Sequence, residues 1–256
     1  QLTTARRATI RDVAERAGVH PATASRALNP ALPGRIAAET TAKVEAAARE
    51  LGYTPDPAAR SLRTRRSGFV GIVVPDLTNP VIAPIVRGIE EALWSAGIAC
   101  LLADTDNSPE REATLIGELL ARRCEGLIVA TARRTDDAVS ALADPDQVPT
   151  VLVTRGMDDG SLPFVAGDDA LGVTAAVEHL TALGHTRIAH LTGPLDLQTT
   201  VRRLEAFRAA LPDGIVRHGA GFTIEAGREL ADELLASQDG REITAVLAGN
   251  DMIALG

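Results

Sequence analysis

The sequence predicts a small all-α head with a helix-turn-helix, followed by a larger α/β body of two doubly wound lobes. Three observations carry this prediction. Residues 9–29 (TIRDVAERAGVHPATASRALN) have the spacing of two short helices joined by a glycine turn. After residue 68, short β-branched apolar runs alternate with amphipathic helical segments. Residues 1–66 hold 12 Lys and Arg against 6 Asp and Glu, whereas residues 67–256 hold 14 against 28. A basic head suits a polyanionic partner, and an acidic body discourages nonspecific contact with one.

The first helix of the head is expected from about residue 10 to residue 17. Thr9 is an N-cap candidate and Asp12 follows it by three residues, which is the spacing of a capping box. Gly18 stands directly after the helix, where a positive φ lets the chain turn sharply. We therefore expect two helices that cross at a steep angle.

A second helix of about two turns follows and is closed by the pair Asn29-Pro30. His20 is placed to cap this helix, and Pro21 suits its first position, which tolerates a missing N–H. A helix inserted into a groove N-terminus first presents its outward side chains to base edges. The outward side chains here are Pro21, Ala22, Ser25, Arg26 and Asn29. The alternative is a helical hairpin that serves only packing.

A third helix is expected from about residue 37 to residue 51, followed by an extended segment at Tyr53. Asp56-Pro57 then provides an N-cap and a first-position proline for a hinge helix at about residues 56–64. Such a helix is marginal alone, because isolated helices below roughly 12 residues are not stable in water. We expect it to fold only against a second copy of the chain and DNA. The alternative is a plain linker with a basic tail.

The body divides into a first lobe at about residues 68–166 and a partial second lobe at about residues 167–256. In the first lobe, buried parallel strands are expected at 69–75, 98–104, 126–131 and 150–154, with helices at about 81–96 and 110–123. In the second, helices are expected near 170–183, 200–211 and 224–236, and strands at 187–192, 214–218 and 245–249. Ligands of such sheets bind beyond the carboxyl ends of the strands.

The sequence contains no pattern typical of catalysis or metal binding. The five histidines lack the HExxH spacing, and neither a phosphate loop nor GxSxG is present. Cys100 and Cys124 lie in apolar, strand-like surroundings and read as small core residues rather than as a disulfide or metal pair. We therefore expect a protein that is not an enzyme and that has no metal or cofactor.

Four segments in order, TIRDVAERAGVHPATASRALN, YTPDPAARSLRT, PDLTNP and LAGNDMIALG, resemble the lactose-repressor (LacI/GalR) family of bacterial transcription regulators. The resemblance covers essentially the whole chain. It implies a DNA-binding head with its hinge helix at 1–67, and a periplasmic-binding-protein-like effector-binding and dimerisation domain at 68–256. It also implies a ligand-responsive repressor that binds double-stranded operator DNA as a homodimer, with a tetramer left open.

The resemblance assigns DNA contacts to the head. Leu62 matches the leucine that wedges between base pairs in the minor groove and kinks the duplex. The family commonly has Ser at the position of His20 and often has polar residues where this chain has Pro21 and Ala22. Hydrogen-bond readout should therefore fall mostly on Arg26, which suits guanine O6 and N7. The expected DNA-binding residues are Thr9, His20, Pro21, Ala22, Thr23, Ser25, Arg26, Asn29, Tyr53, Ala59, Leu62 and Arg63.

In the body, the resemblance implies a small-molecule effector between the lobes. Phe207 matches an aromatic wall of that cleft, and Asp251 a carboxylate that grips ligand hydroxyls. Arg203 either touches the ligand or braces the lobe. Small aliphatic residues at Val81 and Ile82 remove a stacking platform, which favours a sugar or sugar derivative over a base. The expected effector-binding residues are Asn79, Val81, Ile82, Arg155, Arg203, Phe207, Asn250 and Asp251.

The sequence also bears on the setting of the protein. No apolar run approaches 18 residues and no signal peptide opens the chain, so we expect a cytoplasmic, nucleoid-associated protein without membrane contact. The rival interpretation is a solute (sugar)-binding protein of a transport system, which predicts a signal peptide and no basic head. The chain begins at Gln1 and ends in what reads as the first turn of a helix, so we expect the second lobe to be truncated.

Overall fold

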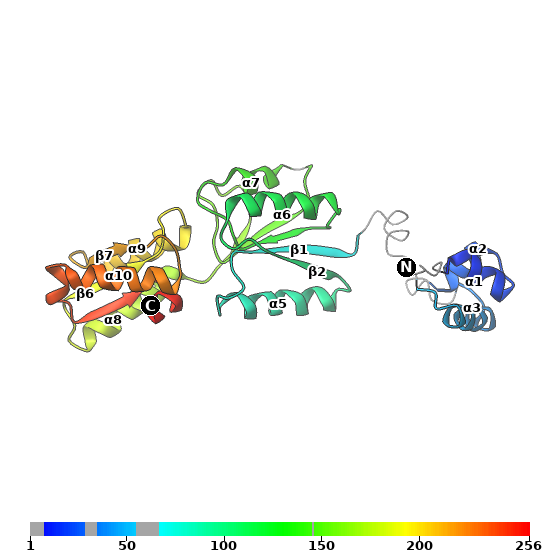
Figure 1. Ribbon diagram of the computed structural model, residues 1–256, viewed down its shortest axis with the longest axis horizontal. Coiled ribbons are helices and arrows are strands. Elements are labelled where there is room, and N and C mark those ends of the chain that lie inside the picture. Colours follow the sequence, from blue (N-terminus) through cyan, green and yellow to red (C-terminus); the bar gives the residue numbers. More distant parts are fainter. Residues whose placement is uncertain (1–7, 29–34, 55–66, 145) are drawn as a thin grey trace, which may run out of the picture. The chain divides into compact units, whose positions relative to one another are not determined.

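The computed structural model describes residues 8–28, 35–54, 67–144 and 146–256. The chain divides into two compact units, Gln1–Ser67 and Gly68–Gly256, which are the head and the body (Figure 1).

The head contains α1 (Ile10–Ala17), α2 (Pro21–Ala27) and α3 (Ala38–Glu50). The predicted capping box is present, because the Thr9 side chain accepts from the Asp12 backbone N–H while the Asp12 carboxylate accepts from the Thr9 N–H. Gly18 has the predicted positive φ of 66°. The three helices meet in a small core of Val13, Ala14, Ala24, Val44, Ala47 and Ala48. The helix-turn-helix predicted from the sequence is thus confirmed.

The first lobe of the body, called the N-lobe, is built on a parallel five-stranded sheet in the order β2-β1-β3-β4-β5. The strands are β1 (Phe69–Val74), β2 (Ala99–Asp104), β3 (Leu127–Val129), β4 (Thr150–Val153) and β5 (Phe164–Val165). The helices are α5 (Ile82–Ser95), α6 (Pro109–Ala121) and α7 (Asp137–Ser140), followed by a short 3-10 turn. Figure 1 shows α5 on one side of this sheet and α6 with α7 on the other.

Alternation along β1 explains the two layers. Val73 packs with Ile116 and Leu119 of α6, whereas Ile72 and Val74 pack in a separate cluster with Ile82 and other residues of α5. A parallel strand buried on both faces reads as a continuous apolar run, which is the run that the sequence shows at 69–75.

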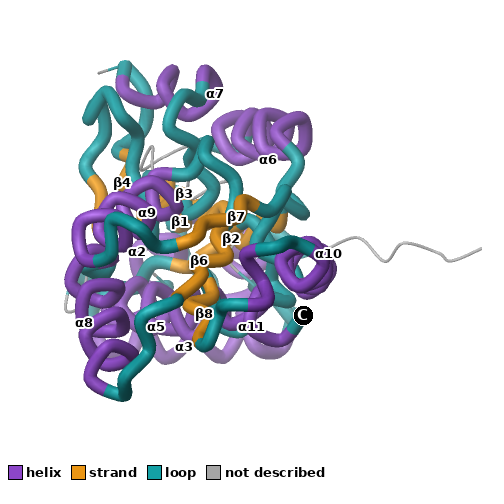
Figure 2. Tube along the Cα trace, turned by 90° about the vertical axis from the view of Figure 1, so that its left-hand side faces the viewer, coloured by secondary structure: helices purple, strands orange, loops and turns teal. Residues whose placement is uncertain are grey.

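The second lobe, called the C-lobe, has a parallel three-stranded sheet in the order β7-β6-β8. Its strands are β6 (Ile188–Thr192), β7 (Ile215–His218) and β8 (Ala245–Ala248). Its helices are α8 (Asp169–Ala182), α9 (Gln198–Ala210), α10 (Ile224–Ala236) and α11 (Asp251–Leu255). At the end of the chain α11 lies against α10 (Figure 2), and a Cβ on Gly227 would lie 2.3 Å from the Ile253 carbonyl oxygen.

The sequence missed two small elements of the N-lobe. The four-residue helix α7 is fixed by the Asp136 cap, whose carboxylate accepts from the Val139 N–H at 3.1 Å. Strand β5 has only two residues, both exposed, which is too short to show the periodicity of a strand. Both elements depend on contacts that a local pattern does not reveal.

The C-lobe core contains a histidine where the neighbouring strand residues are apolar. His190 has no exposed surface, and its ring lies 5.0 Å from that of Phe207. Its Nδ1 donates to the Leu247 carbonyl oxygen at 2.9 Å, and its Nε2 is buried without a partner. Burial is the main cause that lowers the pKa of His190, and the nearby Arg203 and His218 lower it further.

We expect acid to destabilise the protein partly through His190. Because the pKa is lower in the folded state, the unfolded state binds the proton first, and stability falls as the pH drops below about 6.5. Urea unfolding between pH 5 and pH 8 should show a flatter pH dependence for His190→Leu than for the wild type. If the free energy of unfolding falls equally with pH in both proteins, the acid sensitivity belongs to other groups. His218 is one of them, because burial also lowers its pKa.

Candidate nucleic-acid interface and ligand pocket

The outward face of α2 carries the side chains that the sequence predicts for base contact. Ala22, Ser25 and Arg26 are exposed, as is His20 before the helix, whereas Pro21 and Thr23 are half-buried. Thr9 is exposed at the start of α1, and Tyr53 is half-buried against the head core. The remaining predicted DNA-binding residues, Asn29, Ala59, Leu62 and Arg63, lie outside the described residues, as does the predicted hinge helix.

His20 caps α2 in the way that the sequence predicts. Its Nδ1 accepts a hydrogen bond from the Ala22 backbone N–H at 3.2 Å. The neutral ring that makes this bond carries its proton on Nε2, which leaves an N–H donor on the exposed side of the head. His20 thus provides an acceptor for the Ala22 N–H at the start of the helix and keeps a donor suited to a phosphate oxygen.

We expect His20→Ala to destabilise the head by about 1 kcal/mol, because the Ala22 N–H loses its acceptor. His20→Ser should restore the stability, since a serine hydroxyl caps a helix equally well. Thermal unfolding followed by circular dichroism measures both changes. Equal stability of the alanine and serine variants would contradict the capping role.

The body contains a pocket of about 560 Å³, in the size range of small-molecule sites. Residues that follow β1, β2, β3 and β4 line it from the N-lobe, and residues that follow β6, β7 and β8, with the first turns of α9 and α10, line it from the C-lobe. This is the position that the carboxyl-end rule predicts for parallel sheets. Of the predicted effector-binding residues, the pocket brings together Asn79, Val81, Ile82, Arg155, Arg203 and Asn250.

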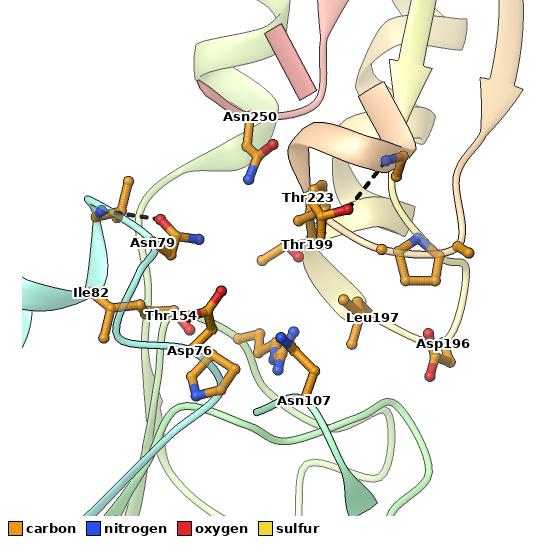
Figure 3. Close-up of a pocket in the computed structure, with 18 of the residues that line it drawn as sticks. Asp76, Asn79, Ile82, Asn107, Thr154, Asp196, Leu197, Thr199, Thr223 and Asn250 are labelled. Carbon is orange, nitrogen blue, oxygen red and sulfur yellow. Dashed lines mark hydrogen bonds between the residues drawn. The ribbon is translucent and has the colours of Figure 1, made fainter. Parts of the chain in front are cut away.

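Two asparagines present hydrogen-bond donors to the cavity. The Asn79 Oδ1 accepts from the Val81 N–H at 3.1 Å, and the Asn250 Oδ1 accepts from the Ile253 N–H at 2.9 Å. Because each oxygen is held by backbone, each amide nitrogen is left for a ligand, and Figure 3 shows both directed into the cavity.

The arginines of the pocket are held by protein acceptors. Arg203 pairs with Asp169 at 2.7 Å and donates to the Gly249 carbonyl oxygen, so it braces the lobe as well as lining the pocket. Arg155 is 9% exposed and donates through Nη2 to the Thr131 carbonyl oxygen at 2.9 Å, while its Nε is buried without a partner. Burial, aided by Arg133, lowers the pKa of Arg155 to about 10.

Thr154 is a lining residue that the sequence analysis did not single out. It stands directly after β4 with a φ of 68°, which is strained for a β-branched residue. Asn107 and Arg133 were also missed, although they follow β2 and β3 as the carboxyl-end rule requires. Thr199 and Thr223 belong to the starts of α9 and α10, and Thr223 caps α10 through the Ala226 N–H at 3.2 Å (Figure 3).

The predicted aromatic wall is corrected by the structure. Phe207 has no exposed surface, because it is packed in the C-lobe core against His190 and Gly214. A side chain without exposed surface does not form a pocket wall, and Phe222 lines the pocket instead. Asp251, the first residue of α11, is exposed and is not among the lining residues, which include its neighbour Asn250.

Three further features concern the described residues. They contain no group of three side chains placed to hold a metal ion. None of their helices is both long and apolar enough to cross a bilayer. Both cysteines are free, and burial raises the pKa of Cys124, as expected for a core residue.

Two family models match the chain. Residues 9–56 match the bacterial regulatory proteins of the lacI family, and residues 67–256 match the periplasmic binding proteins and sugar binding domain of the LacI family. The ribose operon repressor of Escherichia coli (strain K12) is 34% identical over an alignment of 257 positions, which covers 97% of this chain and 76% of the relative. The transcriptional regulator DegA of Bacillus subtilis (strain 168) is 33% identical over 254 residues, covering 96% of this chain and 74% of the relative.

A solved structure of the lac repressor dimer bound to operator and the anti-inducer ONPF is similar over the same span. It is 30% identical with a TM-score of 0.85, and the match covers 98% of this chain and 76% of the other. The chain thus spans about three quarters of the length of these relatives. The matches and the fold agree in both units: the chain belongs to the LacI family of bacterial regulatory proteins and is a DNA-binding transcription regulator.

Proposed function

We propose that this protein is a homodimeric repressor in the cytoplasm, controlled by a neutral, hydroxyl-rich molecule of the sugar class that binds in the pocket of the body. The observation that carries the proposal is the pocket itself, which collects polar side chains from both lobes of the body in a chain whose head exposes α2. A molecule bound to both lobes changes their relative angle, and the chain between body and head couples that change to DNA. The protein needs no cofactor and performs no catalysis.

The charges of the pocket favour a neutral ligand. Asp76, Asp196, Glu225 and Glu229 line it together with Arg133, Arg155 and Arg203. The three guanidinium groups already serve Glu112, Thr131 and Asp169, whereas a phosphate or carboxylate ligand needs an arginine that is free to meet it. Hydroxyl groups, which both donate and accept, match the mixture of carboxylates and asparagine amides. Small aliphatic residues at Val81 and Ile82 offer no stacking surface for a base.

The effector class is tested by thermal-shift screening with pentoses and hexoses, sugar phosphates and nucleosides. A neutral sugar should raise the unfolding temperature, because a ligand that binds only the folded state stabilises it by about 2.7 kcal/mol at 100 times its Kd. Stabilisation by sugar phosphates or nucleosides alone would overturn the neutral class. Release of a palindromic DNA fragment by the same sugar in a gel-shift assay separates a repressor from the rival transport protein, which binds no DNA.

We expect two copies of the chain to meet through the N-lobe. Strand β2 forms the edge of the sheet, and Leu101 and Leu102 on it are 40% and 43% exposed. Trp94, at the end of the adjacent α5, is 74% exposed. Exposed apolar groups beside a sheet edge are typical of a surface covered by a partner. A dimer also supplies the second reading helix that a two-half-site operator needs.

Trp94→Lys is expected to convert the dimer to a monomer, because a charge replaces an apolar anchor at the interface. Light scattering coupled to size exclusion measures the mass. Leu235→Lys, an equally exposed leucine of the C-lobe helix α10 at 71%, is the matched control and should leave the mass unchanged. A wild-type monomer at all concentrations would contradict the homodimer directly.

A further inference from the structure

Residues 194–198 of the C-lobe contact two loops of the N-lobe, and the Arg202 guanidinium of α9 lies 4.9 Å from the centre of the Phe164 ring of β5. The Arg134 backbone N–H donates to the Asp196 carbonyl oxygen at 2.8 Å. Gln198 accepts from the Gly156 N–H at 3.0 Å and donates to the Met157 carbonyl oxygen at 3.2 Å. These two hydrogen bonds of the Gln198 side-chain amide join neutral groups only, and we call them the pivot.

The same segment also makes a charged contact at the edge of the ligand pocket. Arg133 of the N-lobe contacts the Asp196 carboxylate of the C-lobe, with 3.3 Å from Nε to Oδ2. Both residues line the pocket, and Figure 3 shows Asp196 on the side opposite Asn79. We call this ion pair the latch.

Arg133 is anchored far more firmly to its own lobe than to the C-lobe. Its Nη1 lies 3.2 Å from the Oε2 of Glu112, whose side chain is 2% exposed, and its Nη2 donates to the Asn107 carbonyl oxygen at 3.0 Å. Burial raises the pKa of Glu112, and the guanidinium opposes that rise. Removing the partner of a buried charge is strongly destabilising, so Arg133 stays with Glu112 when the lobes move.

Asp196 is the replaceable side of the latch. Its side chain is 53% exposed, and exposed ion pairs contribute little to stability. A ligand in the pocket can therefore take over this carboxylate at small cost, provided that it brings a hydrogen-bond donor such as a hydroxyl group. The pivot involves no lining side chain and is not disturbed by such a ligand.

We propose that Asp196 is a shared acceptor: it holds Arg133 across the lobes in the free protein and accepts from a donor group of the bound ligand instead. Binding then opens the latch while the pivot stays closed, and the lobes turn about Gln198. The ligand half of this inference rests on the proposed function, whereas the latch itself is a property of the free protein. It assigns Asp196 as a binding residue and Arg133 as a positioning residue.

Amide hydrogen exchange of the free protein tests the latch. In Asp196→Asn, exchange at the Arg134 amide should be about fivefold faster than in the wild type, the size expected for loss of an exposed ion pair. Exchange at the Gly156 amide, which belongs to the pivot, should not change. The matched control is Glu118→Gln, which removes an exposed ion pair with Arg122 at the end of the N-lobe helix α6 and should leave both amides unaffected.

The double variant Arg133→Gln with Glu112→Gln removes the latch together with the buried carboxylate that Arg133 neutralises, and it should reproduce the effect of Asp196→Asn. Unchanged exchange at Arg134 in both variants, or the same acceleration in the control Glu118→Gln, would overturn the latch. The ligand part of the inference is tested with the sugar that gives the largest thermal shift. That sugar should speed exchange at Arg134 in the wild type and bind Asp196→Asn at least about fivefold more weakly. A sugar that binds both proteins equally and leaves exchange unchanged overturns the shared acceptor, whereas a panel in which no sugar binds overturns the proposed effector class and leaves the latch result standing.

Discussion

Arg26→Ala is expected to abolish discrimination at one base position in each half-site of the operator. Arg26 is exposed on α2, and its neighbours Pro21 and Ala22 carry no side-chain hydrogen-bonding group. A guanidinium that bonds to guanine O6 and N7 contributes about 1–3 kcal/mol of discrimination. In a homodimer the loss occurs twice, so affinity for the cognate site should fall by at least about tenfold.

Selection of binding sites from a randomised palindrome measures this effect. The motif recovered with Arg26→Ala should be degenerate at one position per half-site and otherwise the same as the wild-type motif. Arg49→Ala, which removes an exposed arginine of α3 in the same head, is the charge-matched control. The control should reduce affinity evenly across sequences if it touches phosphate at all. Recovery of the wild-type motif by Arg26→Ala would refute its role in base reading.

Phe207→Ala is expected to lower the free energy of unfolding by about 3–5 kcal/mol, the range for removal of a fully buried aromatic ring. The ring fills the space between His190 and Gly214, where a Cβ on the glycine would lie 2.6 Å from it. The surrounding strands and helices are held by other contacts, so the cavity closes only partly. Urea unfolding of the wild type and the variant measures the difference.

A pair of milder substitutions separates the core from the pocket. Phe207→Leu should destabilise the protein but leave its affinity for the sugar found in the thermal-shift screen unchanged under native conditions. Phe222→Leu should lower the affinity for that sugar and leave the stability unchanged, because Phe222 lines the pocket and is only half-buried. Loss of sugar affinity in Phe207→Leu without loss of stability would restore the wall position that the sequence analysis assigned to Phe207.

The local structure of this chain follows from short-range chemistry. Thr9 with Asp12, Gly18, and His20 with Pro21 define the helices of the head by capping and φ preferences that act over three or four residues. The strands of the body are apolar runs that are recognisable because parallel sheets bury both faces. The charge division between residues 1–66 and 67–256 likewise needs only counting, and it indicated the polyanionic partner before any fold was known.

The set of residues that line the pocket depends instead on the direction in which each side chain points and on contacts between residues far apart in the sequence. On α9, Thr199 and Arg203 are four residues apart and line the pocket, whereas Thr200 and Phe207 are seven residues apart and point into the core. The helical period is visible in the sequence, but the side of the helix that meets the sheet is set by packing against α8 and β6. The sequence therefore placed an aromatic wall at Phe207. Only the fold shows that Phe207 lies in the core and that Phe222 lines the pocket.

The family, the head, the main strands and helices of the body, and the edge at which a ligand binds were determined by the sequence alone, because they depend on periodicity and on residues adjacent in the chain. Tertiary structure decided which side chains meet in the pocket and which bridge the lobes. Arg133 and Asp196 are separated by more than sixty positions in the sequence, and they meet only because two sheets bring the ends of their strands together.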